Sequence, residues 1–134
     1  MKLEEWNRVK FMARTQNIYR HQKDRAKERK IPFEITREDI REVAADAIGK
    51  PCRYCQVPVT YLNFSIDHKT PTQRGGTQTK DNIECICDRC NQIKGNMTPD
   101  EFMAILNTAK TQLEPVAYAH LLARLRAGGR FIYN

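Results

Sequence analysis

The chain has few residues that interrupt helices and no long apolar segment. Of its 134 residues, 6 are glycine and 6 are proline, and neither type occurs in the first 30 positions. No stretch approaches the roughly 18 consecutive apolar residues of a membrane-spanning helix. Residues 2–6 carry glutamates where a signal peptide would have its apolar core. We therefore expect a cytoplasmic protein with no membrane partner.

Acidic residues are also in deficit. Lys and Arg number 23 against 16 Asp and Glu, which gives a formal net charge of +7. This balance favours a polyanionic partner such as a nucleic acid. The hydrophobic share of 40% and the charged share of 29% are typical of a folded protein rather than a disordered one. At this length we expect a single domain, residues 1–134.

The first part of the chain, residues 1–48, is predicted to form basic helices. Over residues 1–30, apolar side chains recur every three or four positions, as they do in helices. Residues 8–30 hold nine Lys or Arg, which favours a surface that follows a phosphate backbone, although such runs are also typical of ordinary solvated faces. Thr36, with Asp39 three residues later, predicts the start of a second helix.

Residues 99–134 are again predicted to be helical. Thr98 and Pro99 have the sequence of a helix start, and Pro115 predicts the start of a last helix that ends at Gly128–Gly129. The expected apolar faces consist of Phe102, Ile105, Leu106 and Ala109 in the first helix, and of Val116, Ala119, Leu122 and Ala123 in the second.

The middle segment, residues 49–98, holds all five cysteines. Short β-prone runs at residues 63–67 and 83–87 flank a polar, turn-rich stretch, which predicts a hairpin with a long loop. A short helix is expected at residues 88–95. The predicted fold class is therefore α+β, mostly helical, with a small core flanked by N- and C-terminal helices.

The cysteines form two pairs, Cys52-x-x-Cys55 and Cys87-x-x-Cys90. Four thiolates complete the closed tetrahedral shell of a structural zinc. The alternatives are a redox site, two unrelated buried pairs or an iron site, but a thioredoxin-like motif needs only one pair and a βαβ context. The interval between the pairs exceeds the roughly 15–20 residues of a zinc ribbon. It therefore leaves room for the predicted hairpin.

Cys85 is left over from these pairs. In a strand it would share a face with Cys87, so a shift of register would let it substitute as a ligand. The simpler interpretation is a small buried hydrophobic residue.

Candidate catalytic residues lie between and beside the cysteine pairs. Asp67 and His68 end the first predicted strand, where a carboxylate oxygen can bind a metal and an imidazole can accept a proton. An Asp-His pair by itself is more often structural than catalytic. Asn82 precedes the second strand, and Asn91 directly follows Cys90. A carboxamide oxygen at residue 91 would be able to share a hard cation with Asp67.

In this order the residues resemble those of the HNH endonucleases. The pattern runs Cys-x-x-Cys, Asp67-His68, Arg74-Gly75-Gly76, Asp81-Asn82 and Cys-x-x-Cys-Asn-x-x-Lys-Gly. It covers about residues 50–98 and is similar to the small phage and bacterial branch with four zinc-binding cysteines. The resemblance implies a ββα-metal core at residues 49–98 and a cytoplasmic protein encoded by a bacterium or phage.

The resemblance also implies roles for individual residues. His68 corresponds to the general base, Asp67 to the acidic metal ligand, and Asn82 to the residue that braces the hairpin loop, although an ordinary turn asparagine is the alternative. Asn91 stands where many members have a histidine. An amide oxygen is a harder ligand than imidazole, so this departure favours Mg²⁺ or Mn²⁺ as the catalytic ion.

The expected function is metal-dependent hydrolysis of DNA that leaves a 5′-phosphate and a 3′-hydroxyl. One chain carries one centre, so we expect nicking of one strand by a monomer or weak dimer. Lys69, Arg74 and Lys94 are candidate nucleic-acid contacts, with a solvated loop arginine and a surface lysine as the alternatives for the last two. The competing function is a non-catalytic, zinc-stabilised adaptor that binds nucleic acid.

Overall fold

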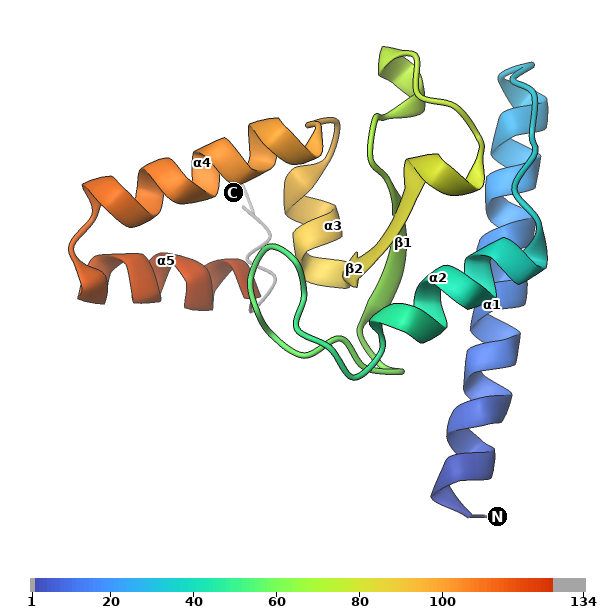
Figure 1. Cartoon of the computed structure of the whole chain (residues 1–134), viewed down its shortest axis with the longest axis horizontal. Coiled ribbons are helices and arrows are strands. Elements are labelled where there is room, and N and C mark those ends of the chain that lie inside the picture. The colour runs from blue at the N-terminus through green and yellow to red at the C-terminus, as the bar shows by residue number, and fades with distance from the viewer. Residues whose placement is uncertain (1, 127–134) are drawn as a thin grey trace, which may run out of the picture.

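A computed structural model describes residues 2–126 of the chain (Figure 1). A two-stranded sheet lies at the centre, the longest helix lies at one end and a pair of helices lies at the other. The helices and strands are α1 (Leu3–Glu28), α2 (Arg37–Ala47), β1 (Phe64–His68), β2 (Ile83–Cys87), α3 (Asp88–Lys94), α4 (Pro99–Gln112) and α5 (Pro115–Arg126). The prediction of a mostly helical α+β fold is confirmed.

The two strands form the predicted long-looped hairpin. They pair antiparallel, with Phe64 opposite Cys87 at one end and His68 opposite Ile83 at the other. The loop between them contains two short 3₁₀ turns, Thr72–Arg74 and Lys80–Asn82. α3 follows β2 without a linker, so the two strands and this helix form one continuous unit.

The predicted helix starts are confirmed at α2 and α4. The Thr36 side chain accepts a hydrogen bond from the backbone of Asp39, and the Asp39 carboxylate accepts one from the Thr36 backbone, which is a complete capping box. At α4, the Thr98 side chain accepts from the backbone of Glu101, and proline occupies the first turn. These caps satisfy N–H groups that have no partner inside the helix.

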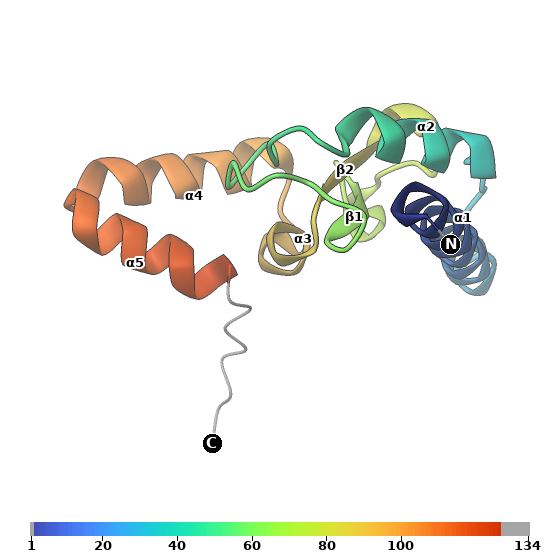
Figure 2. The same cartoon turned by 90° about the horizontal axis from the view of Figure 1, so that it is seen from below.

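The N-terminal helices lie against the hairpin. α2 contacts both strands and α1, and its Ile40 and Ala44 are fully buried. α1 is joined to the first residue of β1, because the Arg14 guanidinium donates to the Phe64 carbonyl at 2.6 Å and the Phe11 ring lies 5.8 Å from the Phe64 ring. Figure 2 shows α1 at the end of the molecule opposite α4 and α5. Within residues 2–126, no helix has both the length and the apolar character needed to cross a membrane.

The C-terminal helices contact the core along a narrow strip. In α4, Phe102 and Leu106 are buried as predicted, but Ile105 is 54% exposed. In α5, Leu122 packs against the core, whereas Val116 is 64% exposed, and Ala119 and Ala123 are exposed as well. The broader apolar faces expected from the sequence are wrong, because the two helices project away from the hairpin (Figure 1). The expected end at Gly128–Gly129 lies outside the described residues.

Candidate functional site

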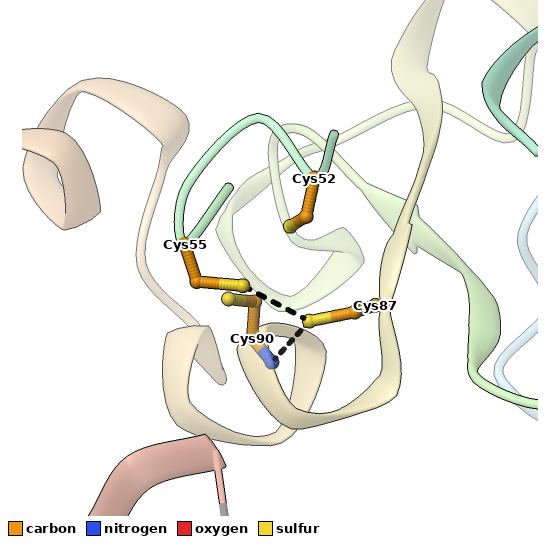
Figure 3. A group of neighbouring side chains, drawn as sticks. All are labelled: Cys52, Cys55, Cys87 and Cys90. Atoms are coloured by element: carbon orange, nitrogen blue, oxygen red, sulfur yellow. Dashed lines mark hydrogen bonds between the residues drawn. The ribbon is translucent and has the colours of Figure 1, made fainter. Parts of the chain in front are cut away.

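The four paired cysteines converge on one point beside the hairpin. Cys52 and Cys55 come from the loop that precedes β1, Cys87 ends β2 and Cys90 lies in α3 (Figure 3). All four are buried, and their sulfur atoms lie within 4.8 Å of one another. The Cys55 and Cys87 sulfurs are 3.6 Å apart. The cluster could therefore hold a metal ion such as zinc, since Zn–S bonds of about 2.3 Å in a tetrahedron separate neighbouring sulfurs by about 3.8 Å.

Local backbone geometry shapes this cluster. The Cys52 N–H donates to the Val57 carbonyl at 2.7 Å, and the Gln56 N–H donates to the Cys52 carbonyl at 3.0 Å. Gln56 has a φ of +65°, a left-handed conformation that closes the first turn. At the other pair, the Cys90 N–H donates to the Cys87 sulfur at 3.5 Å, so the cysteine that ends β2 also caps α3.

Cys85 does not belong to this cluster. It lies opposite Ile66 in the sheet and packs half-buried against the core. Burial raises the pKa of its thiol to about 12, and Cys85 is not among the four cysteines whose sulfur atoms converge. Its interpretation as a small hydrophobic residue is confirmed, and the register shift that would make it a ligand is absent.

A second polar centre lies on the α1 side of the hairpin. A cavity of about 250 Å³ is lined by β1, the hairpin loop, α3 and α1. Asp67, His68 and Asn91 all line it, so three of the four candidate catalytic residues share one cavity. Asn82, the fourth, does not line it. The arrangement places a carboxylate, an imidazole and a carboxamide around one small volume.

Asp67 is buried and paired with a lysine. Its carboxylate lies 2.7 Å from the ammonium of Lys94, which is itself fully buried. Burial raises the pKa of Asp67, and the Lys94 ammonium opposes that shift. Glu84, opposite Asp67 in the sheet, raises it further. The lysine thus supplies the counter-charge that allows a buried carboxylate in this cavity.

His68 is held by a side chain that no sequence motif indicates. Its Nε2 lies 2.6 Å from Oε1 of Gln78, which is 6% exposed. Burial lowers the pKa of His68 against the opposing effect of the Gln78 hydrogen bond, and the positive charges of Arg25 and Lys94 lower it further. Burial and these charges favour the neutral imidazole. Gln78 lies in a polar loop with no recognisable motif, so nothing in the sequence singled it out.

The hydrogen bonds expected for Asn82 are present. Its Oδ1 accepts from the Thr70 N–H at 3.0 Å, and its Nδ2 donates to the carbonyls of Thr70 and Thr77 at 3.0 and 2.8 Å. Gly76 packs against the same Thr70 backbone that Asn82 binds. A Cβ atom at residue 76 would lie 1.8 Å from the Thr70 carbonyl oxygen, so only glycine fits beside this backbone. The loop that carries Gln78 is therefore clamped onto the end of β1.

The candidate nucleic-acid contacts have different surroundings. Lys94 donates to the His68 and Lys69 carbonyls at 3.0 and 3.4 Å, so the surface-lysine interpretation is wrong: this side chain serves the buried centre. Arg74 is half-exposed and pairs with Glu101 at 2.6 Å. Lys69 is half-buried, and its N–H donates to the Asn82 carbonyl. Lys94 has no exposed side-chain surface to offer nucleic acid, whereas contact of Lys69 or Arg74 with nucleic acid stays a prediction.

Comparison with known proteins agrees with this geometry. Residues 52–107 match the family model described as HNH endonuclease. The chain is 38% identical over 76 residues to a CRISPR-associated endonuclease Cas9 of Corynebacterium diphtheriae, covering 56% of this chain and 6% of that protein. It is 30% identical over 92 residues to a Cas9 of Actinomyces naeslundii, covering 67% of this chain and 8% of that protein.

The chain thus spans less than a tenth of the length of these two relatives. The matched residues include all four clustered cysteines and every candidate catalytic residue. The two-stranded sheet followed by a helix, the cysteine cluster and the family match agree on one assignment: residues 52–107 form an HNH endonuclease domain, with the ββα-metal fold of that family.

Proposed function

We propose that this protein is a divalent-metal-dependent endonuclease that nicks one strand of DNA, with His68 as the general base. The observation that carries the proposal is the fixed orientation of His68 beside Asp67 and Asn91. Both relatives are named endonucleases, which supports phosphodiester cleavage. The net charge of +7 supports a nucleic-acid substrate.

The contact with Gln78 determines which nitrogen of His68 accepts the proton. An amide oxygen has no proton to donate, so the Nε2 that faces Oε1 of Gln78 must carry the hydrogen. Nδ1 is then the unprotonated nitrogen of the neutral imidazole. Because burial and nearby cations lower the pKa of His68, this neutral form is the one present at pH 7.

Hydrolysis needs a proton acceptor for the attacking water, and Nδ1 supplies it. His68 takes one proton from a water molecule as the water oxygen forms a bond to phosphorus. The bond between phosphorus and the 3′ oxygen breaks, and the departing oxygen takes a proton from solvent. The products carry a 5′-phosphate and a 3′-hydroxyl. Asn82 acts indirectly, because it clamps the loop from which Gln78 orients the base.

Two metal sites fit the residues present. The sulfur cluster suits structural zinc, since soft thiolates prefer that ion. Asp67 and Asn91 offer hard oxygen atoms to the cavity, a donor set that suits Mg²⁺ or Mn²⁺. A divalent ion held there would offset negative charge on the phosphate oxygens. One such centre per chain favours nicking by a monomer or weak dimer.

The test is a nicking assay on supercoiled plasmid with Mg²⁺ or Mn²⁺. We expect the wild-type protein to convert the plasmid to the open circle, and DNA ligase to reseal the nick because it carries a 5′-phosphate. His68→Ala should keep its zinc and bind DNA while it loses cleavage. A chelator is not an adequate control, because it also removes zinc and unfolds zinc-dependent domains.

The same assay separates the enzyme from the non-catalytic adaptor. An adaptor would bind the plasmid and leave it supercoiled with every divalent ion. Zinc content, measured on the same preparations, shows whether an inactive protein is correctly folded. Cleavage by His68→Ala at the wild-type rate would reject the assignment of the base.

A further inference from the structure

α1 forms the second wall of the cavity that contains His68. Gln22, Arg25, Ala26 and Arg29 all line it. Their spacing of three, one and three residues places them on one face of the helix. Gln22 is 4% exposed and Ala26 is 1% exposed, so this face lies close against the hairpin. The small Ala26 side chain allows that close approach.

The Gln22 side chain is buried without a partner for its oxygen. Among the described residues, Oε1 has no hydrogen-bond donor. A buried, unsatisfied acceptor is destabilising, and native proteins rarely leave one without a reason. An amide oxygen only accepts, and a phosphodiester has no proton to give at neutral pH. A water molecule in the cavity supplies the donor that this oxygen lacks.

A nucleophilic water has two protons, and the two walls offer two acceptors. On the hairpin side, His68 lines the cavity, and with Nε2 donating to Gln78 its free acceptor is Nδ1. Gln22 Oε1 is the acceptor on the α1 side. A water that donates to both has a lone pair left to direct at phosphorus. Orientation of this kind lowers a barrier without any change in the base itself.

Arg25 brings a positive charge to the same cavity. It lines the same cavity as His68, and its charge contributes to the lowered pKa of that imidazole. Arg25 is exposed, and among the described residues no carboxylate pairs with it or with any other Lys or Arg of α1. Arg29, one turn further, donates to the Thr72 hydroxyl at 3.2 Å and so joins α1 to the hairpin loop. A guanidinium without a partner beside a hydrolytic centre matches a phosphate oxygen.

We propose that α1 is part of the nuclease site, with Gln22 holding the attacking water and Arg25 binding a nonbridging oxygen of the phosphate that is cleaved. This inference rests on the proposed function and adds two residues that contact the reacting groups. Arg25 offsets charge that builds up on the phosphate as water attacks. α1 therefore does more than track the DNA backbone from outside the site.

Two pairs of variants test the roles separately. Gln22→Leu removes the acceptor and keeps the volume, and Gln16→Leu is its matched control on α1 outside the cavity. Arg25→Ala removes the guanidinium, and Lys110→Ala removes a positive charge from the distant end of α4. The measurements are the single-turnover cleavage rate at saturating DNA, the DNA dissociation constant and the melting temperature of each protein.

We expect Gln22→Leu to cleave at least ten-fold more slowly with unchanged DNA affinity, and Gln22→Glu, which keeps an acceptor oxygen, to recover part of the rate. Arg25→Ala should also lose at least ten-fold at saturating DNA, and Arg25→Lys should recover part of that loss. Both controls should behave as wild type. A wild-type saturating rate in Gln22→Leu overturns the role of the glutamine, and a loss confined to affinity in Arg25→Ala overturns that of the arginine.

Failure of this inference is distinguishable from failure of the proposed function. If the wild-type protein cleaves DNA through His68 but tolerates both α1 substitutions, only the role of α1 is wrong. If the wild-type protein cleaves no DNA, the proposed function itself is wrong.

Discussion

The two walls of the central cavity use their polar side chains in different ways. On the wall formed by the hairpin and α3, Asp67 is paired with Lys94 and His68 is held by Gln78. On the α1 wall, the Gln22 oxygen and the Arg25 guanidinium have no partner among the described residues. The first wall is already organised by protein contacts, whereas the Gln22 oxygen and the Arg25 guanidinium of the second wall are left to contact something else.

This difference suggests a division of tasks. Groups that carry protons or bind ions need a fixed geometry, which buried pairs and short hydrogen bonds provide. Groups that contact a substrate must remain unpaired until it arrives. Because the hairpin wall also contains Cys87 and Cys90 of the cysteine cluster, loss of a metal held there should damage this wall first. Substitutions at the cysteine cluster should therefore have larger effects than substitutions at single contacts of the hairpin wall.

The largest effect is expected at the cysteine cluster. Cys90→Ser should lose the zinc and with it the cooperative unfolding transition, because binding of structural zinc supplies about 10–16 kcal/mol of apparent free energy in small zinc domains. Cys85→Ser is the matched control, since Cys85 lies outside the cluster. Metal content and thermal unfolding by circular dichroism measure the outcome. Retention of zinc and of the wild-type melting temperature by Cys90→Ser would contradict the metal site.

The next effect concerns the buried ion pair. Lys94→Met leaves Asp67 buried without its counter-charge, which should lower the free energy of unfolding by about 3–5 kcal/mol. Adding Asp67→Leu removes the stranded carboxylate, so the double variant should regain much of that stability. Urea unfolding of the three zinc-loaded proteins gives these values. If Lys94→Met is as stable as wild type, the pair does not organise this wall.

A smaller effect is expected at Gln78. A carboxylate in its place stabilises the imidazolium, so Gln78→Glu should raise the pKa of His68. Because the neutral imidazole is the active form, the acidic limb of the rate profile should move to higher pH. Gln78→Ala, the control, removes the contact without adding charge and should lower the rate with no upward shift. A wild-type pH profile in Gln78→Glu would show that Gln78 does not face the base in the active protein.

The hairpin wall was largely predictable from the sequence, and the α1 wall was not. Short-range spacing identified the cysteine pairs, Asp67, His68 and the hydrogen-bonding asparagine Asn82, because β1, β2 and α3 are close in the chain. Gln22 and Arg25 lie more than 40 positions before His68. Only tertiary packing brings them to the cavity, so the sequence showed a basic helix and not a second wall.

The burial of individual side chains also could not be predicted from residue spacing. Lys94 has the sequence environment of a surface lysine one turn from Asn91, yet the carboxylate of Asp67 draws it into the interior. Ile105 has the periodicity of a core residue, yet it is exposed, because α4 contacts the core over a narrow strip. In both cases the packing of a neighbouring element determines whether the side chain is buried. That element lies outside the local sequence pattern.

The most direct measurement is the single-turnover rate of DNA cleavage by His68→Ala at saturating DNA and Mg²⁺. General-base catalysis contributes about 10²–10⁴-fold, so we expect the rate to fall by at least 100-fold. DNA affinity and zinc content should equal those of wild type. A rate within a few-fold of wild type would contradict the assignment of His68 as the base at the centre of this cavity.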